Sequence, residues 1–229
     1  MSQKKAETTT PDSSTLQMSI DRILVNNTRV IYYDPYSGND MNLTFGHFDT
    51  KITTFDPTHL LFDIPSITLK GLKGHFYQLK PLQKTITKTV AENAAQPGNV
   101  LQFLNKEMLI SDVNVAFNSE PSNLKSSFII GDLNAHPKTI DLKNSIRNFK
   151  DAKLSNSTIA IETDSKAVKV QPKDSVLTTA PTPPFKIISS DLVIKNSNLK
   201  FNDVSAPHAP KGIDYVHLNM QDISLDASN

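Results

Sequence analysis

The sequence predicts an all-β protein: one elongated sheet of repeated short antiparallel strands, bent into an open β-groove. Three observations predict this fold class. Apolar residues alternate in short runs, a repeated pair of Asn and a hydroxyl residue shifts that alternation, and the apolar content is low. The alternation begins near Ser19 and is clear at Val113, Val115 and Phe117, as expected for strands that bury one face.

An internal repeat marks three places in the chain. Residues 23–34 (ILVNNTRVIYYD), 152–163 (AKLSNSTIAIET) and 192–203 (LVIKNSNLKFND) align without gaps. Apolar residues occupy the same columns in all three copies, which indicates a recurring structural unit. Near the centre of each copy stand the pairs Asn27-Thr28, Asn156-Ser157 and Asn196-Ser197.

The spacing across each pair predicts a kink. Val25 and Val30 are five residues apart, so they would face opposite sides of a straight strand. Asn tolerates left-handed backbone, and a bulge or a corner at the pair returns both apolar residues to one face. The same shift is expected at Pro65-Ser66 and at Gln221-Asp222. The alternative is an ordinary sandwich of separate short strands joined by tight turns.

The composition agrees with a thin sheet. Hydrophobic residues make up 38% of the chain, and 7 glycines in 229 residues add about 3%. The sum, about 41%, lies below the ~45–50% of an average domain. A sheet with one apolar and one wet face needs fewer apolar residues than a sandwich, and Asn with Ser or Thr, rather than Gly, is expected to mark its bends. About 14 strands at ~4.8 Å each predict a groove of roughly 65 Å.

The chain is expected to form one extended groove segment, residues 19–229, after a disordered tail at 1–18. The spacing of Leu82, Ile86 and Val90 predicts a short helical or loop insertion at 82–108. The prolines of 171–184 predict an exposed, extended connection. The repeat-bearing parts are then 19–81, 109–170 and 185–229.

Several classes of protein are not expected. A formal charge of +1, from 24 Lys and Arg against 23 Asp and Glu, argues against nucleic-acid binding. With Cys 0 there is no disulfide and no thiolate metal site. No run approaches the ~18 apolar residues of a membrane-spanning helix, and the polar residues 1–15 carry no export signal.

Motifs that carry catalytic chemistry are missing as well. The sequence has no GxSxG, no P-loop and no GxGxxG. Its histidines show no HExxH, no HxH and no acid at ligand spacing, so a metal site needs a tertiary coincidence. We therefore expect a protein that is not an enzyme, with no catalytic residue, no metal ligand and no cofactor. The six histidines are His47, His59, His75, His136, His208 and His217.

A lysine-rich stretch, residues 70–88, contains no acidic residue. It is either a solvated loop flank or a contact for anionic lipid head groups. Its members are Lys70, Lys73, Lys80, Lys84 and Lys88.

Four blocks carry a resemblance to a known family: IDRILVNNTRVIYYD, FIIGDLNAHPKTIDLKNSIRNFKDAKLSNSTIAIETD, DLVIKNSNLKFND and GIDYVHLNMQDISLDA. In these blocks the chain resembles the amino-terminal, AsmA-like part of the TamB family, the inner-membrane subunits of the translocation and assembly module of diderm bacteria. It looks most like the Bacteroidota-type members. The resemblance covers most of the chain from Ser19 to Asn229 and lies in strand patterns rather than in invariant chemistry.

The resemblance implies a taco-like β-groove with an apolar inner face that carries phospholipid between the inner and outer membranes. It also implies a supporting role in the assembly of outer-membrane proteins, with an Omp85-type outer-membrane barrel as partner through a carboxy-terminal region absent from this chain. The implied location is the periplasm and cell envelope, with an inner-membrane anchor in a segment outside this chain.

If phospholipid acyl chains lie in the groove, its lining is aliphatic and aromatic. In a closed sandwich the same residues would be core contacts. The candidates are Val25, Val30, Tyr32, Leu154, Ile159, Ile161, Ile194, Leu199 and Phe201.

Two other functions compete with lipid transfer. A β-rich structural or adhesion scaffold would recruit protein partners through exposed strand edges. A carbohydrate-active β-helix would need stacked aromatic rings, and with Trp 0 and Tyr 5 it is the poorest fit.

Overall fold

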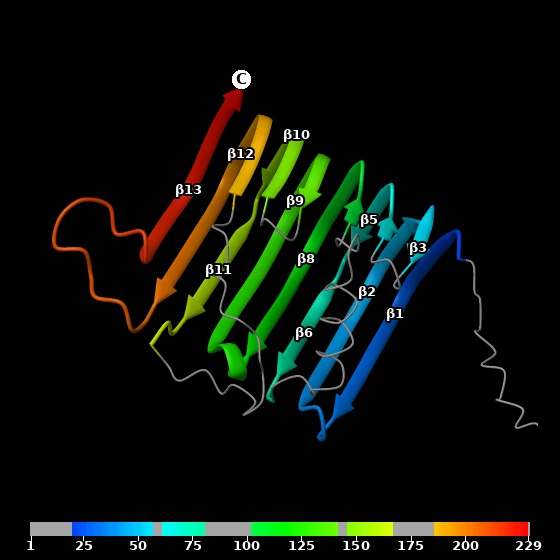
Figure 1. The fold of residues 1–229 in the computed structure, drawn as a ribbon, viewed down its shortest axis with the longest axis horizontal. Helices are drawn as coiled ribbons and strands as arrows, with labels where there is room; N and C mark the ends of the chain where they lie inside the picture. The colour runs from blue at the N-terminus through cyan, green and yellow to red at the C-terminus, as the bar shows by residue number, and fades with distance from the viewer. Residues whose placement is uncertain (1–19, 57–60, 81–101, 142–145, 167–185, 229) are drawn as a thin grey trace, which may run out of the picture.

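The structure is a computed structural model that describes residues 20–56, 61–80, 102–141, 146–166 and 186–228. These residues form one mixed sheet of 13 strands and a turn of 3-10 helix, η1 (Glu120–Ser122), and they confirm the all-β class (Figure 1). The strands are β1 (Arg22–Asp34), β2 (Asn39–Lys51), β3 (Thr54–Asp56), β4 (Leu61–Asp63), β5 (Ser66–Lys70), β6 (Lys73–Gln78), β7 (Gln102–Leu104), β8 (Glu107–Ser119), β9 (Leu124–Asp141), β10 (Ile146–Ser155), β11 (Thr158–Thr163), β12 (Lys186–Asp203) and β13 (His217–Ser228).

The strands lie in eight rows, because short strands follow one another in line. β5 and β6 both lie between β2 and β8. In the same way β10 and β11 lie between β9 and β12, and β4 lies between β3 and β7. Across the sheet the rows are β1; β2 with β3; β4 with β5 and β6; β7 with β8; β9; β10 with β11; β12; and β13.

The sheet is therefore shorter across its rows than the sequence predicts. Eight rows about 4.8 Å apart span roughly 34 Å, about half of the expected 65 Å. The expectation is wrong because it gives every short strand a row of its own. The outer rows, β1 and β13, each have a single neighbour among the described strands.

Strand direction also differs from the expected antiparallel pattern. Most neighbouring rows are antiparallel, but β5 and β6 run parallel to β8, and β10 and β11 run parallel to β12. Two parallel neighbouring strands begin at the same end of the sheet, so the chain needs a long connection between them. Such a connection precedes the parallel row at both places. Parts of these connections, residues 81–101 and 167–185, lie outside the described residues.

Other expected segments fall partly outside the described chain. The tail at 1–18 and the connection at 171–184 lie outside it, as does most of the expected insertion at 82–108. Most of the remainder of that insertion is strand: β7 occupies Gln102–Leu104 and β8 begins at Glu107. The helical interpretation is wrong there, because the apolar residues near the end of the segment pair with neighbouring strands.

The predicted kinks are present in the repeat. Asn27, Asn156 and Asn196 have φ values of 45°, 52° and 47°, in the left-handed region that Asn tolerates. Asp222 has φ 50° beside the predicted shift at Gln221. These positions lie on one line that crosses every row, and we call it the crease. Its members, one from each row, are Asn27, Gly46, Gly71, Asp112, Gly131, Asn156, Asn196 and Asp222.

Each row turns a corner at the crease and returns its apolar residues to the same face. Phe45 and Phe48, three residues apart in β2, have ring centroids 6.3 Å apart and so share a face. The pairing register of β1 with β2 is unchanged across the crease, which means that no residue is inserted. Of the two possibilities left open by the sequence, the corner applies here, whereas β12 and β13 have a register shift between Ile194 and Leu199.

The hydroxyl residue of each repeat satisfies a backbone carbonyl at the corner. In all three copies the hydroxyl donates to the carbonyl oxygen two residues earlier in the chain, so the same local bond recurs. The bonds are Thr28 Oγ1 to Asn26 O at 2.9 Å, Ser157 Oγ to Ser155 O at 2.8 Å, and Ser197 Oγ to Lys195 O at 2.8 Å.

Hydrogen bonds also run along the crease from row to row. The Gly131 N–H donates to Ser157 Oγ at 3.2 Å, and the Ser157 N–H donates to Ser197 Oγ at 3.3 Å. Ser157 and Ser197 are only 1% and 2% exposed. Buried hydroxyls therefore join adjacent corners.

Glycine contributes to the crease, contrary to the expectation that only Asn pairs mark the bends. Three of the 7 glycines, Gly46, Gly71 and Gly131, lie on this line. A Cβ on Gly131 would lie 2.7 Å from the carbonyl oxygen of Asn156, so the neighbouring corner leaves no room for a side chain. Gly71 has a positive φ of 69°, which glycine adopts without strain.

A second bend crosses part of the sheet nearer its other end. The strand is interrupted at Ile64-Pro65, one residue before the predicted position Pro65-Ser66. The Pro65 carbonyl accepts the N–H groups of Lys106 at 3.0 Å and Glu107 at 3.1 Å. Asn105 Nδ2 donates to the Ile64 carbonyl at 2.8 Å. In the same region the β9–β10 register shifts on both sides of Phe149.

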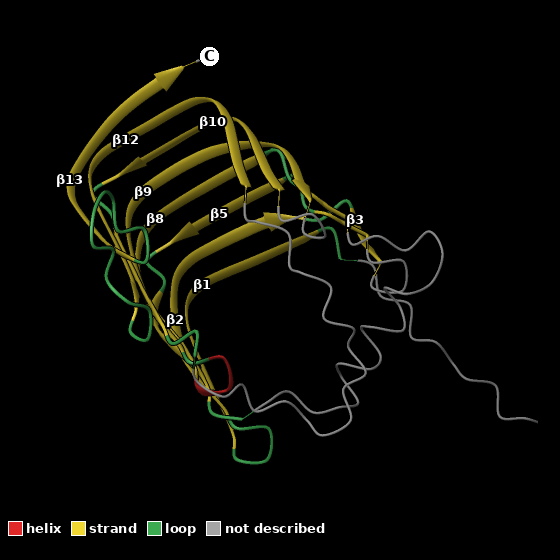
Figure 2. Cartoon of the chain, turned by 60° about the vertical axis from the view of Figure 1, so that its left-hand side comes forward, coloured by secondary structure: helices red, strands yellow, loops and turns green. Residues whose placement is uncertain are grey.

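The bends make the sheet strongly concave. Figure 2 shows the long strands arching together, so that the sheet encloses an open trough on one side. That concave side faces the viewer in Figure 1, where the rows lie side by side from β1 to β13. The predicted bent, groove-like sheet is thus present.

The left-handed backbone at Asn196 predicts how substitutions at this position change the stability of the protein. Asn196→Val should lower the free energy of unfolding by about 1–2 kcal/mol, because a β-branched residue is strained at this positive φ. Asn196→Gly, which adopts the same φ without strain, is the matched control and should change stability by less than about 0.5 kcal/mol. Urea denaturation measures both, and equal losses for Val and Gly would contradict the role of backbone conformation.

Candidate functional site: an apolar groove

One face of the sheet is apolar from the first row to the last. Directly paired residues of neighbouring strands point to the same face. Val25 therefore shares a face with Phe48 of β2, which in turn pairs with Leu69 of β5. Across the central rows the same face carries Phe76 and Phe117, whose stacked rings have centroids 5.7 Å apart.

All nine candidate residues lie on this face. In the last rows, Leu154 pairs with Ile194, Ile159 with Leu199, and Ile161 with Phe201. In β1, Val30 and Tyr32 pair with residues of β2 on the same side of the sheet as Val25. The shift at each Asn is what places residues from both halves of a repeat on one surface.

The central rows add lining residues that the repeat did not identify. They lie outside the three repeat copies, but their alternation was a usable signal, since β8 places Val113, Val115 and Phe117 on the groove face. The additional lining residues include Leu43, Phe45, Phe48, Leu69, Phe76, Ile110, Val113, Val115, Phe117, Phe128, Leu133, Met220 and Leu225.

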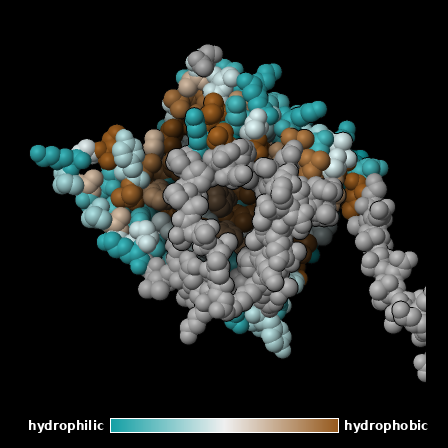
Figure 3. All heavy atoms as spheres, viewed as in Figure 1, coloured by the Kyte–Doolittle hydropathy of each residue, from teal (hydrophilic) through white to brown (hydrophobic). Residues whose placement is uncertain are grey.

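This face is concave and only partly buried. Where this side of the sheet is visible in Figure 3, hydrophobic residues lie toward the middle and hydrophilic residues toward the margins. Of the described apolar residues, only Val113 and Ala135 are nearly inaccessible, at 7% and 1% exposed. Val30 and Tyr32, in the edge row, remain 37% and 47% exposed. The described strands thus line an open surface, with no second sheet packed against it.

The opposite, convex face is polar. Arg22 on this face donates to Asp49 of β2 at 2.6 Å and forms an ion pair there. Lys70 and Lys73 of the lysine-rich stretch share this face with His47, beside a shallow depression where the crease glycines leave no side chains. These two lysines therefore point away from the groove, while Lys84 and Lys88 lie outside the described residues.

Polar side chains form one rim of the groove. Asp203, at the end of β12, is 7% exposed and accepts hydrogen bonds from the Ser165 N–H at 3.1 Å and the Ser205 hydroxyl at 3.0 Å. Hydrogen bonds from the hydroxyl and N–H of Ser165, with those from Ser205, outweigh burial and lower the pKa of Asp203 to about 2. The carboxylate ties the ends of β11 and β12 together.

Sequence reasoning missed one cluster of potential metal ligands. Ligand atoms of His208 and Asp214, in the loop between β12 and β13, and of His217, at the start of β13, lie within 4.8 Å of one another. The expectation that no histidine has an acid at ligand spacing is wrong here. A usable signal was that the three residues lie close together in the sequence, in a short segment that contains the turn-forming residues Pro210 and Gly212.

No described helix has the length and hydropathy needed to cross a bilayer. No protein-family model matches the chain, and neither does any curated protein.

The rim predicts a loss of stability in acid. Because the pKa of Asp203 is about 2 in the folded protein and near 3.9 in an unfolded chain, its contribution is present above about pH 4 and is lost as pH falls toward 2. Asp203→Asn should reduce the change in urea midpoint between pH 5 and pH 2. The control is Asp226→Asn, on the exposed convex side of β13. If this control reduced the change in urea midpoint as much as Asp203→Asn does, the loss of stability in acid could not be assigned to Asp203.

Proposed function

We propose that the concave apolar face binds the acyl chains of phospholipids, and that the chain is a lipid-conducting segment of a TamB-like, AsmA-like envelope protein. The observation that carries the proposal is the continuous, half-exposed apolar surface across all eight rows. A soluble domain normally closes such a surface with a second layer, because apolar area exposed to water is unfavourable. An acyl chain in the trough would cover it instead.

The chemistry of the lining favours an apolar chain over a polar ligand. Along β12 from Leu192, the one charged residue on the groove face is Asp203, and it stands at the rim. The central rows offer aliphatic and aromatic side chains, such as Phe76, Phe117 and Phe128. Each methylene removed from water contributes about 0.8 kcal/mol, without any requirement for a particular head group. Low head-group selectivity is therefore expected.

The family resemblance supplies the biological setting of the proposal. In that setting the segment lies in the periplasm, carries phospholipid between the two membranes and supports outer-membrane protein assembly with an Omp85-type barrel. The periplasmic location, the anchor and the barrel partner rest on the resemblance alone. The groove itself rests on the pairing of the strands and on the exposure of their apolar face.

A matched pair of substitutions tests the groove. Ile161 lies on the apolar face, and its neighbour Ala160 lies on the convex face of the same strand. Ile161→Asp should reduce binding of a phospholipid with a photoreactive acyl chain about tenfold or more, because the lining loses a half-exposed isoleucine that the acyl chain would cover and gains a charge. Ala160→Asp should bind as the unchanged protein does. Crosslinking yield and lipid extraction with mass spectrometry measure both.

The crosslinking and lipid-extraction experiments also distinguish lipid binding from the alternative, a scaffold that recruits protein partners. The edges of β1 and β13 are unpaired among the described strands, and such edges suit strand addition by a protein partner. A scaffold would have no bound lipid and no crosslinks at Val30, Ile161 or Phe201. Lipid-free protein that also fails to crosslink would overturn the acyl-chain proposal and favour the scaffold.

A further inference from the structure

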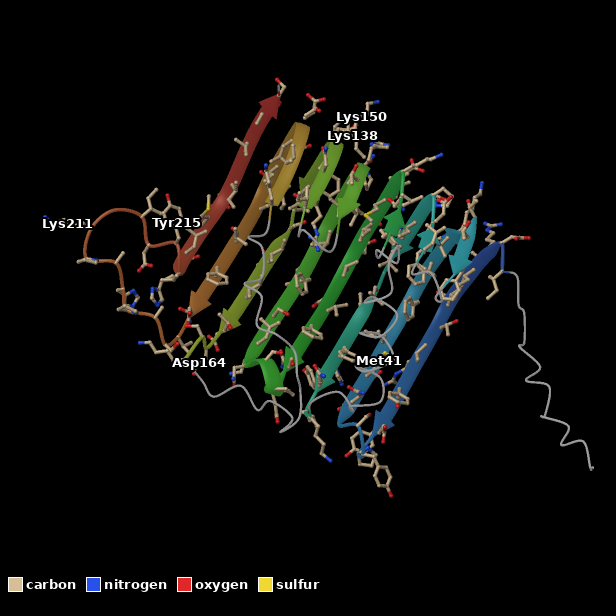
Figure 4. All side chains as sticks on the ribbon, in the orientation of Figure 1. Met41, Lys138, Lys150, Asp164, Lys211 and Tyr215 are labelled. Carbon is tan, nitrogen blue, oxygen red and sulfur yellow. The ribbon has the colours of Figure 1, made fainter. Side chains whose placement is uncertain are left out.

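A short loop gathers two imidazoles around one carboxylate. The loop follows β12 and leads into β13, and Figure 4 shows it, with Lys211 and Tyr215 labelled, beyond the edge of the sheet. His208 Nδ1 lies 3.2 Å from Asp214 Oδ2, and His217 Nδ1 lies 3.0 Å from the same oxygen. The two imidazole rings have centroids 3.9 Å apart. Three potential ligand atoms therefore converge on one point.

The backbone holds the carboxylate in this position. Asp214 Oδ2 also accepts the Ala209 N–H at 3.1 Å, and Oδ1 accepts the Val216 N–H at 3.3 Å. The side chains of Asp214 and His217 are only 21% and 11% exposed, whereas that of His208 is 81% exposed. Two of the three groups are thus fixed by the fold, and the third reaches them from the solvent side.

We propose that His208, Asp214 and His217 bind one Zn²⁺ ion through the two Nδ1 atoms and a carboxylate oxygen, leaving a fourth position open to water. Tetrahedral zinc with bonds of ~2.0–2.1 Å to nitrogen and oxygen holds its ligand atoms about 3.3–3.4 Å apart. The distances from Asp214 Oδ2 to the two imidazole nitrogens, 3.2 and 3.0 Å, are already close to that spacing. Small rotations of the histidine side chains would therefore open the site for the ion.

The ligand types favour zinc over the common hard cations. Ca²⁺ and Mg²⁺ prefer six or more oxygen ligands, whereas imidazole suits Zn²⁺ and its neighbours in the first transition row. Without the metal, each Nδ1–H can donate to the Asp214 carboxylate. When zinc binds, the lone pairs of both Nδ1 atoms face the ion, and any proton on them moves to Nε2 or to solvent.

Bound zinc would fasten the last row of the sheet. Asp203 ends β12 and His217 begins β13, so the ligand loop is the connection between these two strands. The Asp203 N–H also donates to the Val216 carbonyl at 2.8 Å, next to the ligand His217. A metal clip at this connection would limit fraying of β13, which has one neighbouring strand among those described. This role is independent of what the groove binds.

Metal binding to the full chain, made without a polyhistidine tag and stripped with a chelator, tests the proposal. Titration with ZnCl₂ should give one site per chain, and Co²⁺ should give the intense visible absorption of a tetrahedral site. His208→Ala should weaken zinc binding at least ~10-fold, since even partners outside the ligand set typically change affinity by 10–100-fold. His208 is largely exposed, so its loss should leave the fold intact.

Two further measurements complete the test. His75→Ala removes a histidine that lies 3.5 Å from Asp40, far from this loop in sequence, and should bind zinc as the unchanged protein does. At the same zinc concentration, the Tm of the unchanged protein and of His75→Ala should rise by more than that of His208→Ala. The proposal is overturned if the stripped protein binds no zinc at one equivalent, or if His208→Ala and His75→Ala bind it equally. In either case the cluster only shapes the loop.

Discussion

The structure depends on a phase constraint: every row of the sheet must turn its corner at the same level. Side chains alternate between the two faces of a strand, so a row that ran straight through the crease would send its polar residues into the groove. The rows meet this constraint with different residues, left-handed Asn27, Asn156 and Asn196 in the repeat and glycines in the centre. Because all rows shift together, backbone pairing continues through the bend. The apolar face is preserved in every row, and the register is unchanged between β1 and β2, although it shifts between β12 and β13.

The same constraint explains the unusual distribution of burial. A single bent layer has no opposing layer to fill its concave side, so most of its apolar residues are half-buried by their neighbours in the sheet. Three of the buried polar side chains, those of Ser157, Ser197 and Asp203, lie at the crease and at the rim, where they satisfy backbone donors and acceptors. Backbone pairing between strands and hydrogen bonds at the crease stabilise the sheet, and the apolar face remains accessible to a ligand.

The sequence was sufficient to predict the bends and one face of the sheet, because the alternation and its shift are local properties. The repeat alone placed Val25, Val30 and Ile161 on one surface, and the structure agrees. Row assignment is not local: that β5 and β6 share a row follows only from their common neighbours β2 and β8. The His208 cluster was missed for a related reason, since a turn of the loop, and not a regular spacing, brings the Asp214 carboxylate within hydrogen-bond distance of both imidazoles.

The crease has a mechanical consequence. A flat single-layer sheet flexes easily about any line that runs in its plane, but a sheet folded along a line resists bending of that line, as a gutter or an angle bar does. Here the fold line runs across all eight rows, from Asn27 in β1 to Asp222 in β13. Hydrogen bonds between adjacent corners, such as that from Gly131 to Ser157, keep the fold from flattening. One layer of strands can in this way act as a stiff beam along the trough.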